Sequence, residues 1–194
     1  MATEHEYINK IKGYQDYDSL LTLWHQKRED KIDPNEWASE KLFEYIILRA
    51  FELEGAEVTY PYSVYYHEEI VEQIDGAIRI ENHIMLVECK DYSYDRKVNI
   101  DPLAKLRNQL LRRHASVFGM FFSASGYTEP VEDLVKFMGP QMIILWTMED
   151  IDYCMKHHCF VNCFYAKYKY AVEQCEYNFK FGAFEMMEEL KNGK

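Results

Sequence analysis

Three residues of this sequence combine two carboxylates with an amine: Asp75, Glu88 and Lys90. Asp75 lies in a segment, 74–80, where isoleucines alternate with other residues, which is typical of a strand. Glu88 directly follows an apolar run, 84–87, which is typical of a strand covered on both faces. Carboxylates bind divalent cations and a lysine ammonium binds phosphate oxygens. These residue types therefore predict metal-dependent phosphodiester chemistry.

A turn predicted at Glu81-Asn82-His83 connects the two strands and brings these residues together as a hairpin. If Ile80 pairs with His83, Asp75 falls opposite Glu88. If Ile80 pairs with Ile84 instead, Asp75 slips by one residue. Under either register the two carboxylates lie close together.

Side chains alternate along a strand, so Glu88 and Lys90 share one face and Cys89 points to the other. An acidic residue two positions before a lysine occurs four times in the chain, and three of the four lie in polar surroundings. Only the pair at Glu88 ends an apolar strand, where a charged cluster is costly unless it is paired or binds an ion. The alternative is a solvated ion pair at a strand end.

A helix is expected over 34–54, upstream of the hairpin. Asp33 fits the N-cap, Pro34 the first helical position and Glu36 the capping box, and Gly55 can end the helix.

Glu40 and Glu44 lie one turn apart along one edge of this helix, so either can point into the hairpin site. The alternative for each is a solvated helix glutamate.

Several short motifs, in this order, resemble the PD-(D/E)xK superfamily of restriction-endonuclease-like nucleases, and within it the Mrr-like branch. The resemblance covers roughly 35–155. A departure is that Ile precedes Asp75 where the superfamily name implies proline, which is commonly absent. The motifs are Phe43-Glu44, Gly55-Ala-Glu-Val58, Ile74-Asp75-Gly76, Val87-Glu-Cys-Lys90, Lys105-Leu-Arg-Asn-Gln-Leu-Leu-Arg-Arg113, Gly119-Met-Phe-Phe-Ser-Ala-Ser-Gly-Tyr-Thr128 and Ile143-Ile-Leu-Trp146.

The resemblance implies an α/β fold, namely a restriction-endonuclease-like α/β/α sandwich with a mixed central sheet and extra N- and C-terminal helices. It also implies hydrolysis of DNA phosphodiester bonds. Asp75, Glu88 and the Cys89 carbonyl supply hard oxygen ligands for Mg²⁺, with Mn²⁺ as an alternative ion. Lys90 is expected to orient water or stabilise the phosphate, and Glu44 to steady a bound water or a second ion.

A net charge of −11 opposes nucleic-acid binding, because affinity for phosphates comes largely from Lys and Arg. The local distribution of charge is different. Lys105, Arg107, Arg112 and Arg113 lie with Gln109 on a helix that contains no acid from 103 to 114, and we expect them to contact DNA. The alternative is that the two arginines complement a helix C-terminus.

The segment Cys154-Met-Lys-His-His-Cys159, followed by Cys163, contains the usual ligands of zinc. Cys159 and Cys163 are one helical turn apart among apolar residues, so small buried side chains on a helix face explain them without a metal. The tyrosine-rich tail over 160–184 has mostly helical spacing. It predicts core cover or a dimer surface rather than base stacking, and a homodimer through the C-terminal helices is one expected assembly.

Length and composition fit one domain. With 194 residues, of which 48% are hydrophobic and 28% charged, the chain can bury one core. We expect 1–194 to be a single domain with an N-terminal helical extension over 1–33, a nuclease core over 34–155 and a C-terminal helical extension over 156–194. The other expected elements are two short helices within 1–33, strands near 57–65, 117–123 and 141–146, a hairpin at 72–90, and a helix opened by Thr128 and Pro130.

The five cysteines are odd in number and lack CxxC pairs, which indicates reduced thiols. No apolar run spans a bilayer and the N-terminus lacks a signal-peptide pattern, so we expect a cytoplasmic protein without membrane contact. Two other functions remain open: a catalytically silent nucleic-acid-binding module on the same fold, and a protein-interaction module that uses the acidic surface and the tyrosine-rich tail.

Overall fold

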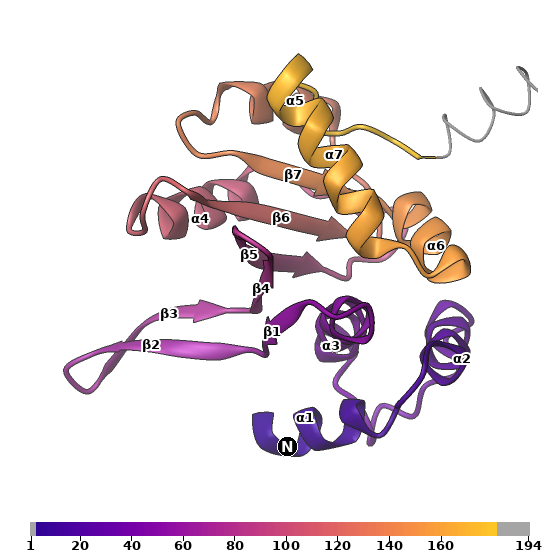
Figure 1. Ribbon diagram of the computed structural model, residues 1–194. Helices are drawn as coiled ribbons and strands as arrows, with labels where there is room; N and C mark the ends of the chain where they lie inside the picture. Colours follow the sequence, from indigo (N-terminus) through magenta and orange to yellow (C-terminus); the bar gives the residue numbers. More distant parts are fainter. Residues whose placement is uncertain (1–2, 182–194) are drawn as a thin grey trace, which may run out of the picture.

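The computed structural model describes residues 3–181, and its centre is a five-stranded sheet (Figure 1). The strand order is β1-β4-β5-β6-β7. β1 pairs with β4 and β4 with β5 in the antiparallel sense, whereas β5, β6 and β7 are parallel. The expected mixed sheet is confirmed. The strands are β1 (Glu57–Thr59), β4 (Gly76–Ile80), β5 (His83–Lys90), β6 (Val117–Ser123) and β7 (Ile143–Trp146).

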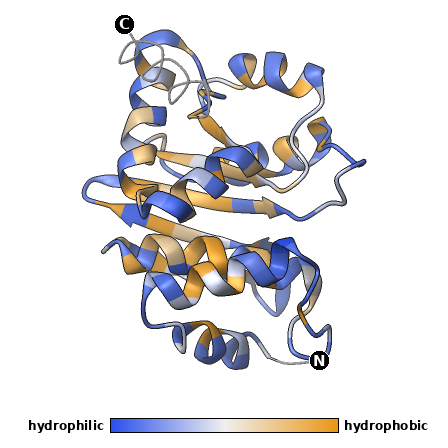
Figure 2. Ribbon diagram, turned by 90° about the vertical axis from the view of Figure 1, so that its right-hand side faces the viewer, coloured by the Kyte–Doolittle hydropathy of each residue, from blue (hydrophilic) through white to orange (hydrophobic). Residues whose placement is uncertain are grey.

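Helices cover both faces of the sheet, which makes an α/β/α sandwich. The parallel pairs β5/β6 and β6/β7 each need a crossover, and these are α4 (Ile100–Leu111) and the pair α5 (Glu129–Leu134) and η1 (Val135–Phe137). Apolar residues are concentrated in the strands and on the helix faces that meet them (Figure 2). The remaining helices pack on the other face: α1 (Glu4–Lys12), α2 (Tyr17–Arg28), α3 (Ser39–Leu53), α6 (Met148–His157) and α7 (Phe160–Gln174).

The β4–β5 hairpin has the first of the two registers considered above. Ile80 pairs with His83, and Gly76 pairs with Val87. Continued by one residue, this register sets Asp75 opposite Glu88. The turn is shorter than expected, because His83 already belongs to β5 and the chain reverses at Glu81 and Asn82.

Three expected element boundaries were wrong. The hairpin expected at 72–90 begins only at Gly76, because Ile74 ends a separate strand, β3 (Glu69–Ile74), which pairs outside the central sheet. The helix expected from 34 begins at Ser39, since Asp33 caps a separate turn through its side chain, which accepts from the Asn35 N–H at 2.8 Å. Gly55 does end this helix, with the positive φ of 89° that a side chain disfavours.

The strand expected over 57–65 is divided at Tyr60-Pro61, because proline lacks the N–H that a continuous ladder needs. Its second half is β2 (Tyr62–Tyr66), which pairs with β3 (Glu69–Ile74) as a separate two-stranded ribbon. Figure 1 shows this ribbon projecting from the central sheet.

The two ends of the described chain pack as cover for the core. Leu20, Leu23 and Trp24 of α2 are at most 2% exposed, and the Trp24 indole donates to Asp152 of α6 at 2.8 Å. In the tail, Phe160 and Phe164 are fully buried, which confirms the core-cover role of this segment. The last part of the predicted tail, 182–184, lies outside the described residues. Among residues 3–181, no helix combines the length and the apolar character needed to cross a membrane.

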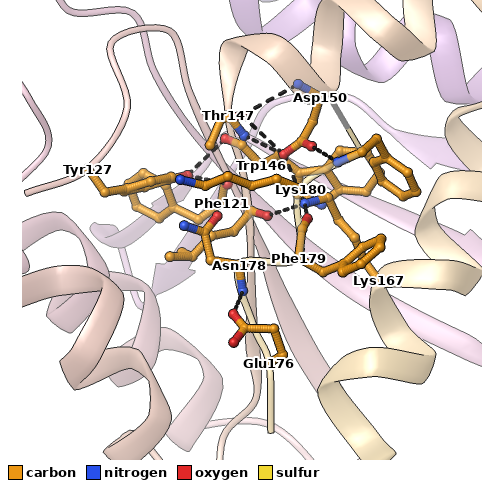
Figure 3. Close-up of polar contacts among 12 residues, drawn as sticks. Phe121, Tyr127, Trp146, Thr147, Asp150, Lys167, Glu176, Asn178, Phe179 and Lys180 are labelled. Carbon is orange, nitrogen blue, oxygen red and sulfur yellow. Dashed lines mark hydrogen bonds and ion pairs between the residues drawn. The ribbon is translucent and has the colours of Figure 1, made fainter. Parts of the chain in front are cut away.

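A buried ion pair fixes α7 against the sheet (Figure 3). Lys167 and Asp150 are at most 1% exposed, and their Nζ and Oδ2 atoms are 2.9 Å apart. Lys167 also donates to the backbone carbonyls of Leu145 at 2.9 Å and of Phe179. Asp150 in turn accepts from the Phe181 N–H at 3.1 Å. One lysine thus ties α6, β7 and the last described segment together.

Replacing Lys167 with Met should destabilise the protein by about 3 kcal/mol or more, because the Asp150 carboxylate is then buried without its counter-charge. Urea unfolding measures the change. Lys169→Met is the matched control on the exposed face of the same helix and should change the free energy of unfolding by less than about 0.5 kcal/mol. Equal effects of the two variants would contradict a structural role for the pair.

Candidate active site

Asp75 lies at the junction of β3 and β4, opposite the end of β5. Its Oδ2 atom accepts a hydrogen bond from the Cys89 N–H at 2.8 Å, which holds the carboxylate beside β5. The chain can pass so close to α3 at this point because the next residue is glycine. A Cβ atom at Gly76 would lie 2.6 Å from a Leu48 methyl group. A larger residue at position 76 would therefore require the Leu48 side chain of α3 to move.

Glu88 is fully buried in β5, yet it carries a carboxylate. Two lysines contact it. Lys90 Nζ is 2.7 Å from Glu88 Oε1, and Lys105 Nζ of α4 is 3.1 Å from both carboxylate oxygens. Lys90 Nζ also donates to the Cys89 carbonyl at 3.1 Å. The structure thus brings together Asp75, Glu88, Lys90 and the Cys89 carbonyl as the sequence predicted, and it adds Lys105.

Glu44, not Glu40, turns toward this cluster. Glu44 is 7% exposed, and its charge interacts with that of Asp75, whereas Glu40 is exposed at the rim. Lys41 contacts Glu44 Oε2 at 3.0 Å and also reaches Glu4 of α1 at 3.2 Å. The sequence could not separate the two glutamates, because both lie on the same edge of the helix.

The carboxylates of the cluster repel one another. Burial and the Glu88 charge raise the pKa of Asp75 to about 6, against the lowering effect of the Cys89 N–H. Burial and the Asp75 charge raise the pKa of Glu44 to about 8. Burial lowers the pKa of Lys90, but the Glu88 charge outweighs it and the net shift is upward. Burial is the larger cause of both raised carboxyl pKa values, and repulsion between neighbouring carboxylates adds to it.

The cluster opens into a cleft of about 560 Å³ between α3, the β2–β3 ribbon and α4. The cleft is lined mainly by polar and charged residues, and its floor includes Asp75, Lys90 and Lys105. Tyr62, Ser63 and Gln73 from the ribbon form part of the wall. These ribbon residues were not predicted to line the site, because the separation of β2 and β3 from the central sheet was not expected.

The predicted basic residues of α4 all have partners within the protein. Lys105 contacts Glu88, as described above. Arg112 and Arg113 both form ion pairs with Glu72 of β3, and Arg113 Nη2 is 2.7 Å from Glu72 Oε2. Glu72 lies on the ribbon and is 7% exposed. The side chains of Lys105 and Arg112 remain 48% and 56% exposed, so they keep access to solvent.

The other two residues of α4 that were expected to contact DNA are Arg107 and Gln109, and both donate hydrogen bonds to backbone carbonyls. Arg107 donates to the Met138 carbonyl at 3.0 Å. Gln109 is only 3% exposed and donates to the Gln73 carbonyl at 3.0 Å, so it fastens α4 to the β2–β3 ribbon. Its position inside the protein gives Gln109 a packing role that the sequence did not indicate.

No protein-family profile matches the chain, and no curated protein matches its sequence. Similar solved structures include AF1548, a protein of unknown function, with 15% identity and a TM-score of 0.45 over 53% of this chain and 56% of that one. R.BspD6I2, the small subunit of the heterodimeric restriction endonuclease R.BspD6I, has 14% identity and a TM-score of 0.49 over 75% and 79%. The restriction endonuclease MspJI, solved with a 27-mer oligonucleotide, has 14% identity and a TM-score of 0.42 over 82% and 35%. At these sequence identities and TM-scores, the function of the chain has to be argued from the residues of the site itself.

Asp75→Asn should raise the stability of the metal-free protein at neutral pH by about 1–2 kcal/mol. The amide removes a charge that the folded state disfavours, and its oxygen can still accept from the Cys89 N–H. Urea unfolding with a chelator present measures the effect. Asp95→Asn, at an exposed position outside the cluster, should leave stability nearly unchanged. A loss of stability in Asp75→Asn would show that repulsion does not dominate at this site.

Glu72 gives a pH-dependent prediction. Burial raises the pKa of Glu72, but the hydrogen bonds from Arg113 and Arg112 lower it by a larger amount. The net shift of the pKa is therefore downward from 4.5. A carboxyl whose folded pKa is depressed stabilises the protein above the unfolded pKa and loses this effect as the pH falls through the folded pKa.

Glu72→Gln should therefore cost about 1–2 kcal/mol at pH 7, and the difference from wild type should shrink below about pH 4.5. Unfolding measured across pH 3–7 tests this. Glu69→Gln is the control, an exposed glutamate on the same strand. A difference that stays constant down to pH 3 would exclude the ion pairs as its cause.

Proposed function

We propose that this protein is a metal-dependent endonuclease that hydrolyses DNA phosphodiester bonds, a restriction-endonuclease-like enzyme of the PD-(D/E)xK type and the Mrr-like branch. The observation that carries the proposal is the convergence of Asp75, Glu88 and Lys90 at one end of the β4–β5 hairpin. Asp75 and Lys90 line a polar cleft, and Glu88 is buried directly behind them in contact with Lys90. Fold alone does not identify chemistry, but this set of groups fits phosphodiester hydrolysis.

The donor atoms of the cluster suit a hard divalent cation. The Asp75 carboxylate, the Glu88 carboxylate and the Cys89 carbonyl offer only oxygen, which Mg²⁺ and Mn²⁺ prefer. Lys90 Nζ contacts both Glu88 Oε1 and the Cys89 carbonyl, so these two oxygens already converge on one positive charge. The upward pKa shifts of Asp75 and Glu44 support a site that gains from added positive charge. When bound, the ion would acidify a water molecule and neutralise charge on the phosphate.

The lysines and Glu44 have separate roles in this proposal. Lys90 lies next to both carboxylates and donates hydrogen bonds to a phosphate oxygen or to the attacking water once Glu88 turns to the ion. Lys105 enters from α4 and contacts both carboxylate oxygens of Glu88, which orients that side chain. Glu44 accepts a hydrogen bond from a water at the site, and Lys41 fixes its position.

The substrate surface continues along α4. Lys105 and Arg112 are half exposed, and both line a hollow between α4 and the ribbon together with Asn108 and the ribbon residue Gln73. A phosphate there would share Arg112 with Glu72. With a net charge of −11, the chain has little general attraction for nucleic acid, so we expect weak non-specific binding that depends strongly on salt.

Glu88→Gln and Lys90→Ala should each reduce Mg²⁺- or Mn²⁺-dependent cleavage of DNA by about 100-fold or more, because each removes a group that contacts the reacting centre. Supercoiled and linear DNA incubated with and without the ions measure this. The control is Glu29→Gln with Lys31→Ala, which has the same spacing and a 2.6 Å ion pair but lies exposed.

Two outcomes would count against the enzyme. Full cleavage by Glu88→Gln would remove the hairpin cluster from the mechanism. No cleavage by wild type, together with retained DNA binding, would instead favour a catalytically silent DNA-binding module.

Arg112→Gln with Arg113→Gln should weaken DNA binding about equally for all sequences, measured in Ca²⁺ to avoid cleavage. Each lost phosphate contact should flatten the slope of log affinity against log salt by roughly 0.9. If the two arginines contact only Glu72 and no phosphate, the double variant should lose stability and the salt slope should stay unchanged. Glu72→Gln is the matched control, since it breaks the same ion pairs but keeps both arginines.

A further inference from the structure

A second cluster of possible metal ligands lies at the junction of α6 and α7. Cys154 of α6, Cys159 in the connection and Cys163 of α7 bring their Sγ atoms to within 4.8 Å of one another. The Cys159 and Cys163 sulfurs are 3.6 Å apart. All three cysteines are free thiols. The sequence favoured separate small buried side chains here, but the structure gathers the three sulfurs around one point.

The chain is shaped so that the sulfurs meet. The connection between the helices is only two residues long, and His158 turns it back with a left-handed conformation, φ 51°. Cys159 then becomes the N-cap of α7, but its side chain makes no capping hydrogen bond. Glu54 of α3 performs that task instead, because its two oxygens accept from the Phe160 and Val161 N–H groups, each at 2.8 Å. Cys159 Sγ is thus left to face the other two thiols.

We propose that Cys154, Cys159 and Cys163 bind one thiophilic metal ion, Zn²⁺, through their three sulfur atoms. A tetrahedral zinc site with Zn–S bonds of about 2.3 Å separates its sulfurs by roughly 3.8 Å. The 3.6 Å between Cys159 and Cys163 is close to this spacing and far from the roughly 2.05 Å of a disulfide bond. Thiolates select zinc over the hard ions that suit the Asp75 cluster, so the two sites take different metals.

The electrostatic surroundings support thiolate ligands. Cys159 and Cys163 lie at the N-terminus and first turn of a 15-residue helix, where the helix dipole favours negative charge. Binding replaces S–H bonds with metal–sulfur bonds and releases up to three protons to solvent, with no change in oxidation state.

Three sulfurs leave a fourth position on the ion, which we assign to water. Glu54 cannot supply it, because its oxygens are held by two backbone N–H groups and by the Tyr17 hydroxyl at 2.7 Å. The ring of His158 stacks on Tyr17, with 4.1 Å between the centroids. Cys154 and Cys163 are buried whereas Cys159 is half-buried, so an ion reaches the cluster from the Cys159 side. The bound ion would fasten α6 to α7 beside α3.

Cobalt titration of the reduced, chelator-treated full-length protein tests the proposal, since thiolate–Co²⁺ bonds give a charge-transfer band in the near ultraviolet that oxygen ligands do not. We expect the band to saturate at about one Co²⁺ per chain and to disappear when Zn²⁺ displaces it. Cys159→Ser and Cys163→Ser should each weaken binding about tenfold or more. Cys175→Ser, at an exposed cysteine outside the cluster, should behave as wild type.

A wild type without the thiolate band, or a Cys159→Ser variant that binds as tightly as wild type, would overturn the site. A thiol count in denaturant before any reduction gives a separate check. Five reactive thiols per chain fit the proposal, whereas three would indicate a disulfide within the cluster and would overturn it. Circular dichroism of each variant verifies that the helices are retained.

Discussion

The burial of Glu88 is the constraint around which the candidate site is organised. A carboxylate without solvent exposure is costly unless counter-charges reach it, and here two lysines from different elements do so, Lys90 from its own strand and Lys105 from α4. The contact from Lys105 also joins α4 to β5. Asp75, brought opposite by the hairpin register, adds a second buried carboxylate beside Glu88. Under the function proposed above, a divalent cation would bind between these carboxylates.

The sequence predicted much of this arrangement, because the relevant signals are local. Alternation and the short turn limit the β4–β5 hairpin to two registers, of which the structure has the one that pairs Ile80 with His83, and the apolar run before Glu88 indicates a buried strand. The sequence could not decide whether Glu40 or Glu44 points into the site, since both lie on one edge of the helix. The choice depends on the rotation of α3 over the sheet, which packing determines. The start of that helix was misplaced because Asp33 and Pro34 form a good turn as readily as a good helix start.

Contacts between distant segments could not be read from the sequence. The four cations of α4 suggested a phosphate-binding surface, but the fold supplies Glu88 and Glu72 as partners from strands 17 and about 40 residues away. The three cysteines gave a similar difficulty. Their spacing fits ordinary packing, and only the two-residue reversal at His158 brings Cys154 back to Cys159 and Cys163. In both cases the sequence shows which residue types are present, but only the fold shows which residues they contact.

The central claim is that Asp75, Glu88 and the Cys89 carbonyl form one divalent-cation site. A crystal soaked in Mn²⁺ and recorded for anomalous scattering tests it most directly. The account predicts an anomalous peak at the end of β5, within bonding distance of all three groups, with the Lys90 ammonium displaced from Glu88. A peak at the thiol cluster or elsewhere, with Lys90 still bonded to Glu88 and no density between the carboxylates, would contradict it.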